Sequence, residues 1–154
     1  MTLEDLGNLG EFVAGLAVVV SLVYLAIQIR QNTSAVRNSA YHEAIRDQAA
    51  GMDQLNSDAG LNRIWYEGLR DFGALSQDEQ RRFATYATSV LRRYENLLYQ
   101  THHGAIDPHA WVGVAEQLKF AFAQRGMVVW WRRAKNLFSP ELVEFVEKDL
   151  LDRG

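Results

Sequence analysis

The sequence contains no cysteine and only two prolines, and no lysine or arginine precedes Arg30. The absence of cysteine excludes disulfides, thiolate metal sites and cysteine nucleophiles. The scarcity of proline, together with abundant Ala, Leu, Gln, Glu and Arg, favours helices. The lack of a basic segment ahead of the first apolar run is unlike a cleaved signal peptide, and no small-x-small cleavage site follows the run.

Sequence motifs that carry well-known chemistries are also missing. The chain has no nucleophile elbow, no phosphate-cradling glycine loop and no zinc-protease motif. It also lacks the Glu-x-x-His pattern that carboxylate-bridged di-iron bundles require. We therefore expect no catalytic residue, no cofactor and no metal.

The net charge of the chain is small, and this bears on its partners. The net charge is −3, and the three acidic residues before Arg30 account for all of it, because acidic and basic residues balance from Arg30 onward. A neutral domain with interspersed charges is a poor candidate for nucleic-acid binding. We expect no nucleic-acid partner.

The longest feature that is present is an uncharged run from Phe12 to Ile29. At about 1.5 Å per residue these 18 residues form a helix about 27 Å long, close to the ~30 Å hydrocarbon core of a bilayer. We predict a single transmembrane helix. The alternative is a buried helix in a soluble bundle, which Gly15, Ser21 and Gln28 favour slightly.

The flanks of this run predict its orientation. Glu4, Asp5 and Glu11 precede it, whereas arginines at 30, 37 and 46 follow it. Because basic flanks stay on the cytoplasmic side, we expect a short N-terminus outside and residues from about 30 in the cytoplasm. This divides the chain into residues 1–30, the flank and membrane helix, and 31–154, a cytoplasmic helical domain.

One face of the predicted membrane helix carries small and polar residues at alternating steps of three and four. We call these seven residues the seam: Gly7, Gly10, Ala14, Ala17, Ser21, Tyr24 and Gln28. A 3.5-residue spacing is typical of a left-handed coiled coil, and small residues let membrane helices approach closely. The seam predicts a homo-oligomer. A pore with Ser21, Tyr24 and Gln28 toward its axis is one alternative, and chance is another.

The segment after the membrane helix has only a thin apolar stripe. Val36, Ala40, Ile45 and Ala49 form it, so a helical stalk here would need partners to bury the stripe. A break at residues 32–34 is the alternative, because Asn, Thr and Ser side chains compete for backbone hydrogen bonds.

Start and stop signals divide the remaining residues into further helices, giving five or six helices in all and no strand. The signals are a start at Asn56-Ser57-Asp58, a capping box of Ser76 and Glu79, a stop at Gly104, a start at Asp107-Pro108, an interruption at Gly126 and a start at Ser139-Pro140. The predicted fold is all-α: one transmembrane helix that continues toward a cytoplasmic helical bundle.

Three sequence blocks carry a resemblance to a known group of proteins. They are GEFVAGLAVVVSLVYLAIQIRQNTSAVR, RRYENLLYQTHHGAIDPHAW and WWRRAKNLFSPELVEFVE, and together they span nearly the whole chain. In this order they resemble a widespread group of short bacterial membrane-anchored proteins of unknown function. The resemblance implies an N-terminal anchor in a bacterial inner membrane and a helical domain, and it implies no activity, cofactor or catalytic residue.

Glu95 and the histidines are the remaining candidates for chemistry. Glu95 lies in an apolar stretch between Tyr94 and Leu97, so we expect a buried ion pair, with Arg63 or Arg70 as partner. A Glu95 carboxyl with a raised pKa, acting with His102 or His109, would make a membrane-bound enzyme.

The segment around Trp130 and Trp131 allows two interpretations. It mixes aromatic residues with Arg132, Arg133 and Lys135, as in segments that lie on a membrane surface. The favoured interpretation is that both tryptophans fill the bundle core. Our leading hypothesis for the whole chain is a membrane-anchored homo-oligomeric scaffold or interaction protein without catalytic activity.

Overall fold

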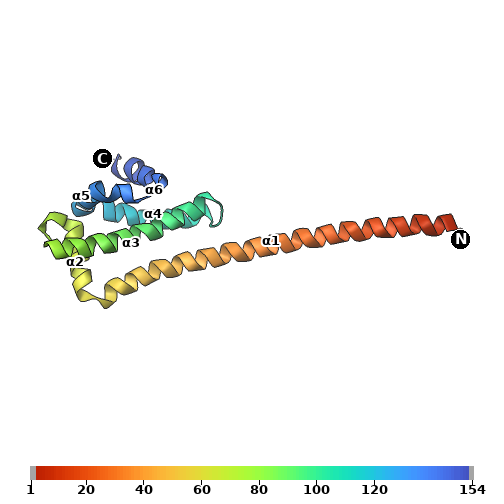
Figure 1. The fold of residues 1–154 in the computed structure, drawn as a ribbon, viewed down its shortest axis with the longest axis horizontal. Coiled ribbons are helices and arrows are strands. Elements are labelled where there is room, and N and C mark those ends of the chain that lie inside the picture. The colour runs from red at the N-terminus through yellow and green to blue at the C-terminus, as the bar shows by residue number, and fades with distance from the viewer. Residues whose placement is uncertain (1–2, 153–154) are drawn as a thin grey trace. The chain divides into compact units, whose positions relative to one another are not determined.

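The computed structural model describes residues 3–152, with side chains described for Gly7, Asn8 and residues 10–152. The side chains of Glu4 and Asp5, which belong to the predicted acidic flank, lie outside the described residues. Residues 3–152 form helices, turns and short loops, with no strand among them. The all-α prediction is confirmed (Figure 1).

The helices begin and end largely at the predicted signals. They are α1 Leu3–Ser57, α2 Ala59–Arg70, the 3₁₀ turn η1 Phe72–Ala74, α3 Gln77–His102, α4 Pro108–Phe122, α5 Arg125–Ala134, the 3₁₀ turn η2 Lys135–Leu137, α6 Pro140–Phe145 and the π-helical turn η3 Val146–Leu151. Side chains of Asp58, Ser76, Asp107 and Ser139 cap α2, α3, α4 and α6. Gly104 follows α3 with a φ of 70°, a conformation that suits glycine.

The chain divides into two compact units, one running through Ser39 and the other beginning at Ala40. The predicted boundary after residue 30 followed the expected membrane edge, whereas this one follows contacts within the chain. The predicted alternative of a break at 32–34 is wrong, since α1 is one helix across these residues (Figure 1). The Thr33 hydroxyl donates to the Ile29 carbonyl 2.8 Å away, so it stays within the helix.

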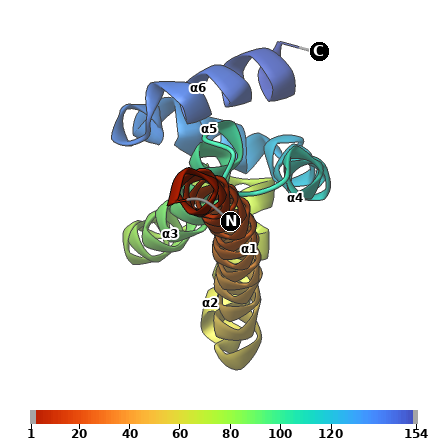
Figure 2. The same ribbon diagram turned by 90° about the vertical axis from the view of Figure 1, so that its right-hand side faces the viewer.

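The unit that begins at Ala40 is built around α3. Helix α2 packs against α3 and α5, and α4 packs against α3 and α5. Helix α6 packs against α3, and η3 against α4, as a layer seen in Figure 2. Trp130 and Trp131 are 3% and 0% exposed, so they fill the core as favoured and do not lie at a membrane surface. Val112 of α4, in contrast, is 59% exposed.

The last part of α1, residues 40–57, belongs to the same unit. Ala44, Gly51 and Leu55 are buried there, and Ala44 packs with Leu97 and Ile106. This face differs from the predicted stripe, whose Ile45 is half exposed. The helical domain thus covers one face of residues 40–57. Two of the three buried residues on that face, Ala44 and Gly51, are small.

Gly126 does not interrupt a helix, contrary to prediction. Helix α4 ends at Phe122, and Gly126 lies in the first turn of α5. A Cβ atom on Gly126 would lie 1.9 Å from the Gly68 carbonyl oxygen and 2.7 Å from that of Leu69. Gly126 is needed because the backbones of α5 and α2 approach closely there.

Candidate functional site

The predicted seam lies along the first part of α1. All seven seam residues are exposed, and a Cβ atom on Gly7 or Gly10 would meet nothing within 4 Å. Apolar residues of α1 outside the seam are equally exposed, at 55% for Leu16 and 61% for Leu22. Each residue from 10 to 39 is therefore accessible in the single chain.

The polar groups of the seam are bonded within α1 itself. The Ser21 hydroxyl donates to the Ala17 carbonyl at 2.8 Å, and the Gln28 amide nitrogen donates to the Tyr24 hydroxyl at 3.1 Å. A helix that pairs its own polar groups can enter an apolar environment at lower cost. When these bonds are formed, the side-chain oxygen of Gln28 and the hydroxyl hydrogen of Tyr24 remain available for further hydrogen bonds.

Helix α1 is long and apolar enough to cross a membrane, and none of its most apolar stretch is buried. A core helix of a soluble protein with the same composition is mostly buried, whereas this one is not. An N-terminal signal sequence meets the same length and composition criteria.

Glu95 is 14% exposed at its side chain and binds two groups. It accepts hydrogen bonds from the Arg92 guanidinium and from the backbone N–H of Ser139, the residue that caps α6. Burial alone raises the pKa of this carboxyl, but the two hydrogen bonds and the charge of Arg92 outweigh it and lower the pKa below the ordinary value.

The partner of Glu95 is thus Arg92 rather than the predicted Arg63 or Arg70. Arg63 pairs with Glu67 and Glu79 instead. The lowered pKa is opposite to the raised pKa that acid chemistry near neutral pH needs.

The histidines considered for the enzyme alternative are exposed and do not converge. His103 stacks on the Tyr99 ring with centroids 4.0 Å apart, and His102 Nδ1 lies 3.8 Å from a Glu141 carboxylate oxygen. His109 is exposed in the first turn of α4. Across the described residues, no three His, Asp or Glu side chains are placed to hold a metal ion.

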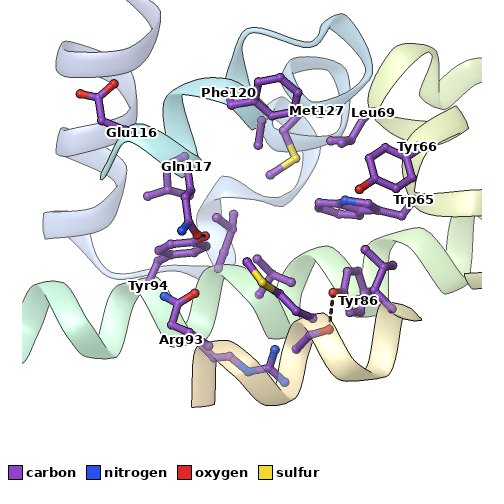
Figure 3. Close-up of a pocket in the computed structure, with 18 of the residues that line it drawn as sticks. Trp65, Tyr66, Leu69, Tyr86, Arg93, Tyr94, Glu116, Gln117, Phe120 and Met127 are labelled. Atoms are coloured by element: carbon purple, nitrogen blue, oxygen red, sulfur yellow. Dashed lines mark hydrogen bonds between the residues drawn. The ribbon is translucent and has the colours of Figure 1, made fainter. Parts of the chain in front are cut away.

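A cavity in the helical domain is the feature that the sequence did not indicate. Its volume is about 600 Å³, and it lies among the 48–56 segment of α1 and helices α2, α3, α4 and α5. Its wall is mostly apolar, and Figure 3 shows Trp65 and Tyr86 near one another and Tyr94 beside Gln117. Five segments distant in sequence form this wall, so no local pattern could have revealed it.

Two tyrosine hydroxyls of the cavity wall are held by hydrogen bonds. Tyr86 donates to the Gly51 carbonyl at 2.8 Å, and Tyr94 donates to the Gln117 side-chain oxygen at 3.0 Å. Burial raises the pKa of Tyr86, and it raises the pKa of Tyr94 to about 12. Both phenols are therefore protonated donors at neutral pH.

Other polar groups of the cavity have no such partners. The Gln48 side-chain nitrogen is buried without a hydrogen-bond partner. Arg93 is half-buried, and among the described residues no carboxylate forms an ion pair with it. Its guanidinium occupies the space that a side chain at Gly51 would fill, since a Cβ there would lie 2.0 Å from Nη1.

Comparisons of the chain with protein-family models, with curated proteins and with solved structures find no match.

Proposed function

We propose that this chain is a single-pass membrane protein that self-associates through the seam and presents its helical domain in the cytoplasm as a scaffold or interaction module. The observation that carries the proposal is that every residue from 10 to 39 is exposed and that the first twenty of these positions are strongly apolar. Exposed apolar area of this extent is unfavourable in water and needs a cover of lipid or protein.

A bilayer supplies the cover for the larger part of this surface. The uncharged run from Phe12 to Ile29 matches the thickness of a hydrocarbon core. The arginines that follow it favour the cytoplasmic side for residues from about 30 onward. The resemblance to short bacterial membrane-anchored proteins supports the same arrangement.

A second copy of the chain supplies the cover for the seam. Glycine and alanine at positions 7, 10, 14 and 17 leave space for a neighbouring backbone. A Cβ atom added to Gly7 or Gly10 would meet nothing within 4 Å. Lipid provides no hydrophobic force between helices, so close van der Waals contact at small residues is what favours pairing.

The proposal assigns no catalysis to the helical domain. Glu95, the best sequence candidate for acid–base chemistry, is engaged by Arg92 and Ser139 and has a lowered pKa. The role that we propose for the anchored helical domain is interaction with other proteins.

Native mass spectrometry of the full-length protein from mild detergent tests self-association. We expect a defined oligomer for the natural sequence and a monomer for Ala14→Phe/Ala17→Phe, because the bulky rings keep the backbones apart. The matched control, Leu16→Phe/Val20→Phe, places the same rings off the seam and is expected to retain the oligomer.

Two results would contradict the seam as the interface. An unchanged oligomer in Ala14→Phe/Ala17→Phe is one. Assembly of a chain that starts at Gln31 is the other, because the helical domain would then carry the contact. Ion flux through liposomes that contain the oligomer would assign the seam to a pore rather than to a scaffold.

A further inference from the structure

The cavity of the helical domain has the size and composition of a small-molecule site. Its volume of about 600 Å³ lies within the range of about 300–1,000 Å³ that ligand pockets occupy. Leu69, Leu91 and Met127 supply buried apolar wall. Tyr66 and Phe120 also line it and are more than half exposed, so the cavity opens to solvent between α2 and α4.

Several hydrogen-bond donors of this cavity have no acceptor in the part of the chain that the structure describes. Gln48 offers a buried, unpartnered amide nitrogen, and Arg93 offers a guanidinium with no carboxylate partner among the described side chains. Gln117 accepts from Tyr94 through its oxygen, which leaves its amide hydrogens. Such a set favours a ligand group that only accepts hydrogen bonds.

The one acidic residue of the wall does not oppose an anion there. Glu116 is exposed, pairs with Lys119 and points away from the aromatic side chains in Figure 3. Arg93 is the one basic residue of the cavity wall. A single guanidinium matches one carboxylate through two parallel hydrogen bonds, whereas phosphate groups are usually bound by clusters of arginines.

The donors come from neighbouring elements. Gln48 and Gly51 are three residues apart on α1, so they lie on one face of that helix. The Arg93 guanidinium occupies the space beside Gly51. A carboxylate at this end of the cavity could accept from both Gln48 and Arg93.

We propose that this cavity binds a small amphipathic carboxylic acid, with its carboxylate on Arg93 and Gln48 and its apolar part among the aromatic and aliphatic wall residues. The inference goes beyond the proposed function and does not depend on it, because every residue of the cavity belongs to the unit that begins at Ala40.

Equilibrium dialysis of radiolabelled octanoate against the full chain in nanodiscs of neutral phosphatidylcholine tests this site, with empty nanodiscs subtracted. 1-Octanol has the same chain without the charge and serves as the second probe. We expect saturable octanoate binding that is roughly tenfold or more tighter than 1-octanol binding, as a charged hydrogen-bonded pair predicts.

Three variants assign the site. Arg93→Gln is expected to weaken octanoate roughly tenfold and to leave 1-octanol binding unchanged. Ala121→Phe fills the apolar wall and is expected to abolish binding of both probes. The matched control, Arg81→Gln, removes an exposed arginine of α3 outside the cavity and is expected to change neither.

The contrary results are equally definite. Absence of saturable octanoate binding by the natural sequence, equal affinities for octanoate and 1-octanol, or an unchanged affinity in Arg93→Gln would each overturn the proposal. Retained binding in Ala121→Phe, with the helix content unchanged by circular dichroism, would assign the octanoate to another place on the chain.

Discussion

Two helical glycines differ sharply in their surroundings. Gly126 lies where the first turn of α5 meets the carbonyl oxygens that end α2, and it has no room for a Cβ atom. Gly113 is exposed in α4 and has nothing within 4 Å of the same position. The sequence presents both as glycines within apolar stretches, and only the packing separates their roles.

Alanine substitution at these two glycines should change stability in opposite directions. Gly126→Ala is expected to lower the free energy of unfolding by about 1–3 kcal/mol, because the backbones of α2 and α5 must move apart. Gly113→Ala is expected to raise it by about 0.5–1 kcal/mol through helix propensity. Urea unfolding monitored by tryptophan fluorescence measures both, and a stabilised Gly126→Ala would refute the close approach.

The helix caps were predictable from the sequence, whereas the ion-pair partner of Glu95 was not. The Ser76–Glu79 capping box and the Asp107-Pro108 start are confirmed, because capping depends on atoms within one turn. The partner of Glu95 was predicted wrongly as Arg63 or Arg70. Arg92 lies three residues away on α3 and reaches Glu95 along the helix surface.

At the scale of elements, Glu95 links α3 to the start of α6. Its carboxylate accepts from the backbone N–H of Ser139, whose own side chain accepts from Leu142 as the N-cap. Leu142 and Val146 are fully buried behind this cap. The Glu95 side chain of α3 thus binds the backbone of Ser139, the N-cap residue of α6.

Glu95→Ala should loosen α6 and η3. We expect a loss of about 1–3 kcal/mol in the free energy of unfolding, because the Ser139 N–H loses its acceptor. Amide hydrogen exchange in residues 138–151 should become faster than in the natural chain. Glu116→Ala, which breaks an exposed pair on α4, is the control and should change stability by less than about 0.5 kcal/mol.

The same variant should show a specific pH dependence. The pKa of Glu95 in the folded chain lies below its ordinary value of 4.5. Its contribution is therefore complete above that value and is lost as the pH falls toward the folded-state pKa. The stability difference between the natural chain and Glu95→Ala should shrink on acidification below pH 4.5, and a constant difference would contradict the ionised pairing.

At the scale of the whole molecule, the absence of cysteine makes the proposed topology directly measurable. Single cysteines at Asn8 and Asp53, both exposed positions, can be labelled without background. An impermeant maleimide is expected to label Asn8→Cys in intact cells, and Asp53→Cys only after the membrane is opened, because the arginines at 30, 37 and 46 favour the cytoplasm.

The possible labelling results separate the arrangements of the chain. The reversed pattern would contradict the orientation, and labelling of both positions in intact cells would contradict a cytoplasmic helical domain. A mature chain that lacks residue 8 by mass would identify the apolar run as a removed signal sequence rather than an anchor.

The sequence by itself determined the all-α class, the main helix starts and the position of the long apolar run, because periodicity, caps and hydropathy depend on neighbours in the chain. It also predicted that Trp130 and Trp131 belong to the core. The tertiary structure alone decided which face of residues 40–57 is covered, why Gly126 must be glycine, and how five segments enclose the cavity beside Arg93. These features depend on contacts between residues far apart in sequence, and no local pattern encodes such contacts.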